Sequence, residues 1–380
     1  MINKYKINTG ASVKDYNKVS DWLSFEIPNK INISSGKVDI GQHISTTLAL
    51  ICSRELEIDI NSIFVNKLNT DITPNEGITA SSLSVPNSGT AIRSASIIFK
   101  KNFLDFAAKY LNLNINNINL EDGVAKDPNS NASISFWDFS KTEEFLKLSI
   151  PEIIEIEDQK NFDHSSHVET KFINSIVKGE YKFLHDLRFD DMLHARIVRP
   201  PSYFHKFLSI NNAIHKYLKD HNLKLYIKNS FIAVLGNDEF EVIKSLNRIK
   251  NSIEWEQVNK LANDKIFNLI DQNSKDSLIV KRGGEAFHEN IPEIKSYNNV
   301  DHKTLTSEFN KPYLMHGSIG PSASCSFYKN GKFIIYSHSQ AIYALKSILS
   351  NAFNLKEKNI TLHFMPVSYT HLRAHETHEN

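Results

Sequence analysis

The chain has 380 residues, of which 41% are hydrophobic and 23% are charged. This apolar fraction is enough for a packed core and excludes a disordered protein, and the length predicts two or three domains at about 150 residues each. Lysine and arginine total 44 against 43 aspartates and glutamates, so the net charge of +1 gives no electrostatic basis for binding nucleic acid or an anionic membrane surface.

In chain order, the first hundred residues predict a strand, a helix, a strand, a loop and a helix. These elements cover residues 30–40, 44–56, 62–69, 71–88 and 91–111. The apolar residues of the first helix recur at helical spacing, and the hydroxyls of Ser45, Thr46 and Thr47 are expected to cap its start. The loop is rich in Thr, Ser, Asn, Pro and Gly, which favour turns.

Later segments also alternate strands with helices. Strands are predicted over residues 181–189, 193–198, 224–227, 231–235, 312–318, 322–328 and 332–337. Helices are predicted over residues 240–252 and 341–353, and Lys329-Asn330-Gly331 predicts a hairpin turn. This alternation predicts an α/β or α+β fold.

Cys52 and Cys325 are far apart and form no CxxC pair. Two isolated thiols cannot build a zinc ribbon, an iron–sulfur site or a disulfide framework, so any electron relay belongs to a cofactor or a partner. The start of the chain has no apolar signal, and no run approaches about 18 apolar residues. We therefore expect no membrane span and a cytoplasmic location, or a periplasmic one if a leader has been lost.

Three polar features are candidates for a binding site. Gly41 and Gln42 lie at a strand-to-helix turn, where backbone N–H groups and an amide can bind a polar ligand. The loop from Thr79 to Thr90 carries five hydroxyls, and Gln340 precedes a second helix. Taken singly, each pattern also fits an ordinary capped junction or an exposed polar loop. No GxGxxG, GxxxxGK[ST], GxSxG or HExxH motif is present.

Together these features resemble the molybdenum-cofactor-binding large subunit of the xanthine dehydrogenase/aldehyde oxidase superfamily. The nearest branch is the isoquinoline 1-oxidoreductase and nicotinate dehydrogenase type. The matching segments, in the family's order, are GKVDIGQHI, TPNEGITASSLSVPNSGTAIR, DDMLHARIVRPPSY, KPYLMHGSIGPS and SHSQAIYALK.

The resemblance implies roles for individual residues. Gly41 and Gln42 match a contact to the pterin of the cofactor, and Gln340 matches a glutamine near the oxo group of the metal. Thr79, Ser82 and Ser84 match hydroxyls that hold the pterin and its phosphate. His43 stands where the family usually has glycine, and its side chain is expected to alter the fit of the cofactor.

The resemblance also implies an α+β architecture, in which a molybdopterin-binding α/β domain precedes an α/β hammerhead domain and the start of a second molybdopterin-binding domain. The expected divisions are a first molybdopterin-binding segment, a linker, the hammerhead, a connector, the truncated second domain and an artefactual tail. They cover residues 1–165, 166–180, 181–258, 259–300, 301–366 and 367–380.

The end of the chain departs from the family. The glutamate that serves as base in the family lies in a later domain, so we expect a truncated chain with no catalytic residue and no activity of its own. His371, His375 and His378 share a helical face, as metal ligands can, but residues 367–380 resemble a translated sequencing adapter. We therefore expect an artefact there and no metal site.

The intact parent is expected to hydroxylate an N-heteroaromatic compound or oxidise an aldehyde with oxygen derived from water. Its molybdenum–pterin cofactor would pass electrons to iron–sulfur clusters on a small partner subunit. The alternative is a non-catalytic α/β binding or scaffold protein with a Ser/Thr-rich ligand loop. Convergence of residues 36–47 and 79–93 on one place would favour the cofactor, whereas opposite faces would favour the scaffold.

Overall fold

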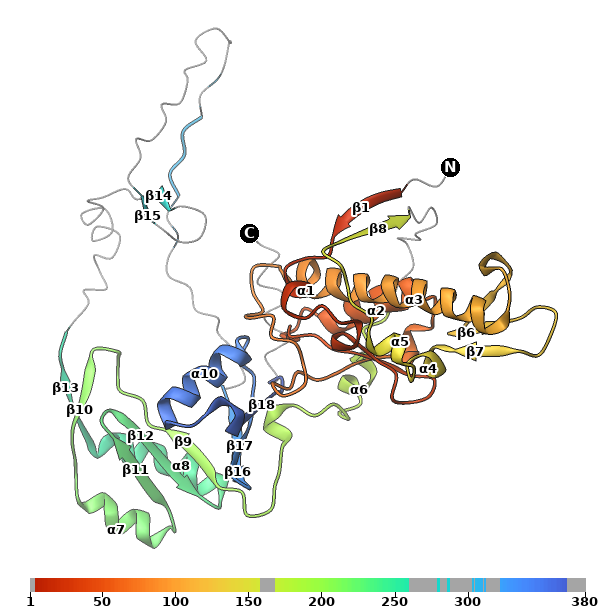
Figure 1. The fold of residues 1–380 in the computed structure, drawn as a ribbon. Helices are drawn as coiled ribbons and strands as arrows, with labels where there is room; N and C mark the ends of the chain where they lie inside the picture. Colours follow the sequence, from red (N-terminus) through yellow and green to blue (C-terminus); the bar gives the residue numbers. More distant parts are fainter. Residues whose placement is uncertain are drawn as a thin grey trace. The chain divides into compact units, whose positions relative to one another are not determined.

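The computed structural model describes residues 4–157, 168–259, 279–280, 286–287, 303, 305–309, 311 and 322–367. The chain divides into two compact units (Figure 1). The first unit comprises Met1–Leu187 together with Leu314–Asn380, and the second comprises Arg188–Tyr313. Both units mix helices and strands, which confirms the predicted fold class.

The first unit contains several small sheets and two long helices. Its strands are β1 (Lys4–Asn8), β2 (Leu23–Ser24), β3 (Ile31–Ile33), β4 (Ile63–Val65), β5 (Asn119–Glu121), β6 (Val124–Lys126), β7 (Ser133–Ser135), β8 (Ile153–Glu157), β16 (Ser324–Lys329), β17 (Lys332–Ser337) and β18 (Ile360–Phe364). Its helices are α1 (Ser12–Asp15), α2 (Ile44–Leu56), α3 (Thr90–Leu111), α4 (Phe136–Phe139), α5 (Glu143–Leu146), α6 (Ile173–Val177) and α10 (Ile342–Phe353). A π-helix, η3 (Val85–Gly89), leads into α3.

Two sheets of the first unit share one topology. In the first, β2 is antiparallel to β3 and β3 is parallel to β4, with α2 as the crossover between the parallel strands. In the second, β16 is antiparallel to β17 and β17 is parallel to β18, with α10 as the crossover. Parallel strands need such a crossover because a tight turn cannot join them.

The main core of the first unit is aromatic. Phe99 and Phe103 lie on the buried side of α3 and are fully buried. Phe99 stacks on Phe25 with ring centroids 4.4 Å apart, and Phe136 meets Phe99 edge-on at 5.0 Å. Phe145 closes the cluster at 5.8 Å from Phe99. This packing anchors α3, and with it the loop that precedes the helix.

A second apolar cluster joins the two chain segments of the first unit. Val38 and Leu68, from the N-terminal segment, are buried with Ile335, Ile360 and Leu362 from the C-terminal segment. The residues are nearly 300 positions apart in the sequence, yet they share one core. This cluster brings β17 and α10 next to the Gly-Gln turn.

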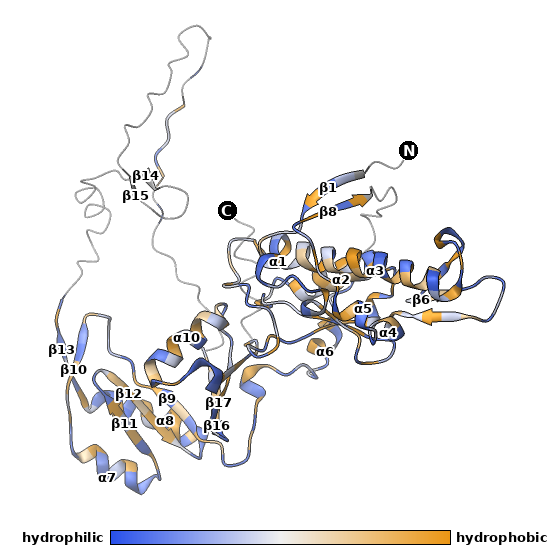
Figure 2. Ribbon diagram, viewed as in Figure 1, coloured by the Kyte–Doolittle hydropathy of each residue, from blue (hydrophilic) through white to orange (hydrophobic). Residues whose placement is uncertain are grey.

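The second unit is a layer of strands covered by helices. Its elements are β9 (His194–Ile197), β10 (His205–Ile210), α7 (Ala213–Asp220), β11 (Lys224–Lys228), β12 (Phe231–Gly236), α8 (Glu239–Asn251), β13 (Ile253–Gln257), β14 (Ile279–Val280) and β15 (Ala286–Phe287). One sheet has the order β11-β12-β9, and β10 pairs with β13. In Figure 2, β12 is mostly hydrophobic, and its Ile232 and Val234 are buried with Val242 and Ile249 of α8.

Two strand predictions are wrong. The expected strand over residues 30–40 ends at Ile33, because the backbone N–H groups that follow donate to side chains and do not join a ladder. Gly36 donates to Glu76, and Val38 donates to the hydroxyl of Thr79. The expected strand over 181–189 is instead a 3₁₀ turn at Leu184–Asp186, where the Asp186 carboxylate accepts from the N–H of Phe183. The expected strand over 312–318 lies outside the described residues.

The predicted helix over residues 44–56 has the predicted bounds, but its predicted caps are wrong. The N-cap is His43, which adopts a left-handed φ of 54° and makes no side-chain cap bond. Ser45 and Thr46 lie inside the first turn, and Thr47 follows them. The backbone N–H of Ser45 donates to Asp39 Oδ2 at 3.3 Å, so a carboxylate six residues earlier serves the start of the helix.

Candidate functional site

The Gly-Gln turn is held by its own glutamine. Gln42 Nε2 donates to the carbonyl oxygen of Val38 at 2.9 Å, and Gln42 Oε1 accepts from the N–H of Ile40 at 2.7 Å. Gly41 has a φ of 109°, a conformation that residues with a side chain rarely adopt. The amide of Gln42 therefore shapes the turn, and Gly41 provides a backbone position without a side chain.

Thr79, Ser82 and Ser84 lie in different environments within the hydroxyl loop. Thr79 is buried at 3% exposure, and its hydroxyl accepts from the N–H of Val38 at 2.9 Å. Ser82 is exposed with a left-handed φ of 54°, and Ser84 is half-buried just before η3. Within the described part of the chain, neither serine hydroxyl forms a hydrogen bond. Both hydroxyls can therefore serve a ligand.

Gln340 lies between the end of β17 and the start of α10. Its backbone carbonyl accepts from the N–H of Thr79 at 3.0 Å, and its Nε2 donates to the Thr79 carbonyl oxygen at 3.2 Å. This reciprocal pair joins residues 261 positions apart. Gln340 is half-buried, so part of its amide faces outward.

The structure thus brings the three predicted segments together through Thr79. Val38, at the base of the Gly-Gln turn, donates to the Thr79 side chain, and Gln340 bonds to the Thr79 backbone on both sides of the peptide. The sequence argument expected this convergence if one ligand were bound there. All these contacts lie within the first unit.

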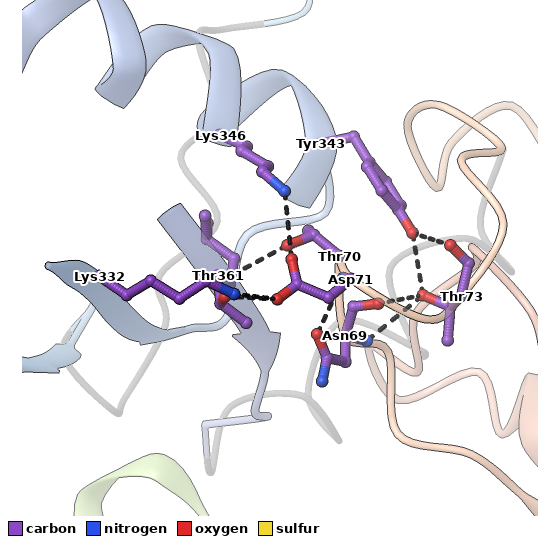
Figure 3. A network of polar contacts seen from close by, with 9 residues as sticks. Asn69, Thr70, Asp71, Thr73, Lys332, Tyr343, Lys346 and Thr361 are labelled. Carbon is purple, nitrogen blue, oxygen red and sulfur yellow. Dashed lines mark hydrogen bonds and ion pairs between the residues drawn. The ribbon is translucent and has the colours of Figure 1, made fainter. Parts of the chain in front are cut away.

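A polar network next to the site fixes the C-terminal segment (Figure 3). Asp71 accepts from the hydroxyl of Thr361 at 2.7 Å and pairs with Lys332 at 3.1 Å and Lys346 at 3.4 Å. Burial raises the pKa of Asp71, but the hydroxyl and the two ammonium groups together outweigh it, so the pKa lies below its ordinary value. One carboxylate therefore binds β17, β18 and α10 at once.

Tyr343 extends this network toward the hydroxyl loop. Its hydroxyl donates to the Thr73 carbonyl oxygen and lies 2.9 Å from the Thr73 hydroxyl, as Figure 3 shows. Thr73 in turn donates to the carbonyl oxygen of Asn69 at 2.8 Å. Burial raises the pKa of Tyr343 to about 12, so the phenol stays protonated and can donate. The start of the loop is therefore tied to α10.

Sequence reasoning missed Asp71 and Tyr343, and it did not identify Glu76 as a site residue. Lone polar residues in a loop carry no periodic signal, and their partners lie far away in the sequence. Glu76 had one available sign, since a single carboxylate stands among serines and threonines beside Gly77.

The thiols and metal-ligand candidates take no part in the site. Burial raises the pKa of the Cys52 thiol to about 12, which keeps it protonated and unreactive. Among the described residues, no group of three His, Cys, Asp or Glu side chains is placed to hold a metal ion. His371, His375 and His378 lie outside the described residues. No helix in the described ranges is both long and apolar enough to cross a membrane.

Comparison with known proteins identifies the N-terminal part of the chain. The profile of the molybdopterin cofactor-binding domain matches residues 1–175. Residues 1–175 form a molybdopterin cofactor-binding domain. This match covers the Gly-Gln turn and the whole hydroxyl loop, and it confirms the resemblance to molybdenum-cofactor-binding subunits.

Longer relatives match beyond this domain. One of the two nicotinate dehydrogenase chains of Pseudomonas putida is 25% identical over 335 residues, which are 83% of this chain and 26% of that protein. Membrane-bound aldehyde dehydrogenase of Gluconacetobacter polyoxogenes is 20% identical over 90% of this chain and 45% of that protein. The chain therefore spans less than half the length of these relatives. Quinoline 2-oxidoreductase of Pseudomonas putida 86 is similar over 51% of this chain and 29% of its own, with a TM-score of 0.32 and 12% identity.

Proposed function

We propose that this chain is part of a molybdenum hydroxylase and that its molybdopterin-binding domain grips the cofactor where Gln42, Thr79 and Gln340 converge. The observation that carries the proposal is the set of hydrogen bonds that joins Val38, Thr79 and Gln340. A site built from two distant segments is complete only in the folded chain, and it presents neutral donors and acceptors. Such groups suit a polar ring system and its phosphate.

The residues present fit this cofactor. We assign its pterin to the turn at Gly41 and Gln42, and we assign Ser82 and Ser84 to its phosphate, because their hydroxyls form no hydrogen bond within the described ranges. Thr79 would act mainly by holding the other segments, since its hydroxyl already bonds to Val38. The bound cofactor would supply the metal centre at which a substrate is oxidised by two electrons. The chain's own task is to orient that centre and, through Gln340, to present an amide to it.

We propose that the 380-residue chain does not turn over substrate by itself. The carboxylates beside the site are engaged in hydrogen bonds that shape the fold. Asp39 accepts from the N–H of Ser45, Asp71 binds Thr361, and Glu76 accepts from Gly36. In the described part of the chain, no further carboxylate stands ready beside the site as a general base.

The substrate class and partner follow from the relatives. One is a chain of nicotinate dehydrogenase and another an aldehyde dehydrogenase, so we propose an N-heteroaromatic or aldehyde substrate. The first relative is named as one subunit of its enzyme, which supports an assembly of several chains, and we propose a small iron–sulfur subunit as the electron acceptor. The cysteines agree with this division, since buried Cys52 and half-buried Cys325 are the two thiols of the chain. We propose a cytoplasmic location, or a periplasmic one with a leader.

The proposal is tested by cofactor content. The 380-residue chain is purified from a host that synthesises the molybdenum cofactor, and bound pterin is measured after oxidation to its fluorescent derivative. We expect bound pterin in the wild-type chain and at least a tenfold loss in the Thr79→Val, Gln340→Leu double variant. The double variant removes the hydroxyl and the amide that join the segments, whereas both side chains keep similar volumes.

Matched controls separate binding from stability. Thr142 caps α5, where its hydroxyl accepts from the N–H of Phe145, and Gln257 lies in the second unit. The Thr142→Val, Gln257→Leu double variant should keep the pterin content of the wild type. A wild-type chain without pterin would contradict the proposal and favour the alternative of a non-catalytic binding or scaffold protein.

A further inference from the structure

The carboxylate of Glu76 collects hydrogen bonds from three separate parts of the first unit. Glu76 Oε1 accepts from the hydroxyl of Ser12 in α1 at 2.7 Å. Glu76 Oε2 accepts from the N–H of Gly36 at 2.8 Å and from the hydroxyl of Ser88 in η3 at 2.6 Å. The Ser35 hydroxyl adds a longer bond at 3.3 Å. A single side chain therefore connects the N-terminal helix, the segment after β3 and the far end of the hydroxyl loop.

The backbone around Glu76 is fixed from the other side by Lys37. The Lys37 ammonium donates to the carbonyl oxygens of Glu76 at 2.7 Å and Ile78 at 2.9 Å. Burial lowers the pKa of Lys37, although the Glu76 charge partly opposes this shift. Gly36 permits the close approach, because a Cβ there would lie 2.2 Å from the carbonyl oxygen of Pro74. The base of the hydroxyl loop is thus held by a carboxylate and an ammonium together.

The loop beyond this base needs such support. Ser81 and Ser82 have φ values of 57° and 54°, in the left-handed region that residues with side chains rarely adopt. Such conformations persist only where the surrounding structure holds them. Both serines are exposed, so the support comes from the ends of the loop, at Glu76 and at Ser88.

We propose that Glu76 is a positioning residue of the cofactor site: it holds the hydroxyl loop in the conformation that presents Ser82 and Ser84 to the pterin and its phosphate. This inference rests on the proposed function, because it takes the cofactor to be the ligand of the loop. Glu76 acts through the loop and does not itself touch the cofactor.

The chemistry of the cluster separates charge from geometry. In Glu76→Gln, the remaining oxygen can accept from Gly36 and Ser88, and the new amide can donate to the Ser12 hydroxyl, which is able to accept. That variant keeps the connections and loses the charge. Glu76→Ala removes all of them, so the two substitutions test whether the hydrogen-bond geometry is what matters.

The experiment measures bound pterin and amide hydrogen exchange in the full 380-residue chain. We expect Glu76→Ala to lower pterin per chain at least tenfold and to speed exchange across residues 77–84, including in chains stripped of cofactor. Glu76→Gln should stay within about twofold of the wild type in both. The control Glu55→Ala removes a carboxylate that pairs with Arg93 at 2.7 Å between α2 and α3, and it should leave pterin content unchanged.

The outcomes distinguish this inference from the proposed function. Wild-type pterin content in Glu76→Ala, while Thr79→Val, Gln340→Leu has lost it, would overturn the positioning role alone. A wild-type chain that binds no pterin would overturn the proposed function and the inference with it. If Glu76→Ala does not fold, Ser88→Ala takes its place with an expected threefold loss, and an unchanged pterin content would overturn the inference.

Discussion

The segments β3–α2–β4 and β17–α10–β18 of the first unit fold alike in fine detail. Each joins two parallel strands through a helix, and each helix ends at a residue in the left-handed region. In the first, the Ser53 hydroxyl donates to the carbonyl oxygen of Ile58 at 2.6 Å. In the second, the Ser350 hydroxyl donates in the same way to the carbonyl oxygen of Leu355. A 3₁₀ turn then leads into the final strand in both.

The two segments differ in what stabilises them. Helix α2 buries seven of its residues, largely against α3, whereas among the residues of α10 only Ile342 is buried. The second segment relies more on polar contacts, in which Asp71 and Thr73 reach Lys346 and Tyr343. A shared topology thus follows from local chain geometry, while the stabilising contacts depend on which neighbours each segment meets.

The largest expected effect breaks the apolar side of this comparison. Leu48 of α2 is 1% exposed, so Leu48→Ala should lower the free energy of unfolding by about 3 kcal/mol through lost burial and the cavity left behind. Ile348 of α10 is 62% exposed, and Ile348→Ala should lower it by less than about 1 kcal/mol. Urea unfolding of both variants measures the difference, and equal losses would contradict the contrast.

A smaller effect is expected on the polar side. Asp71→Asn weakens the contacts to Lys332 and Lys346 and should lower the free energy of unfolding by about 1 kcal/mol, since a side chain that is one-third exposed is partly screened by water. The surface variant Asp127→Asn serves as the matched control and should leave the unfolding transition unchanged. A loss as large as that of Leu48→Ala would mean that the polar network dominates.

The Asp71 contribution should also depend on pH. The folded pKa of Asp71 lies below its ordinary value of 3.8, so its stabilisation is fully present above that value and is lost as the pH falls through the folded pKa. The difference in thermal stability between the wild type and Asp71→Asn should therefore shrink between about pH 5 and pH 2. A difference that grew on acidification would contradict the assignment.

The smallest effect concerns the residue that the resemblance marked as a departure. His43 has a φ of 54°, which explains why glycine suits this position at the helix start. His43→Gly should raise the free energy of unfolding by about 0.5 kcal/mol, because relief of the left-handed strain outweighs the greater freedom of glycine when unfolded. His43→Ala, which keeps the strain, is the control and should not stabilise the chain.

Local patterns in the sequence predicted the local structure well. Helix α2 has the predicted bounds, and β17 covers the predicted residues 332–337. The predictions were wrong where the backbone bonds to distant side chains, as after Ile33, where Glu76 and Thr79 accept from the chain. Periodicity carries no information on such partners, so the strand was extended too far.

The pairing of distant segments was beyond such patterns. Strands β1 and β8 pair across nearly 150 residues, and β1 was not predicted at all. For the site, motif resemblance identified Gln42, Thr79 and Gln340 as a group, but the bonds that join them through Val38 appear only in three dimensions. The supporting residues Asp71 and Glu76 were missed for the same reason.

The most direct test of the central claim is amide hydrogen exchange of the 380-residue chain with and without bound molybdenum cofactor. If one ligand is gripped by the three converging segments, peptides covering residues 38–42, 79–84 and 340–342 should gain protection together, while β11 and β12 of the second unit stay unchanged. Protection of one segment without the other two, or a change confined to the second unit, would contradict the account.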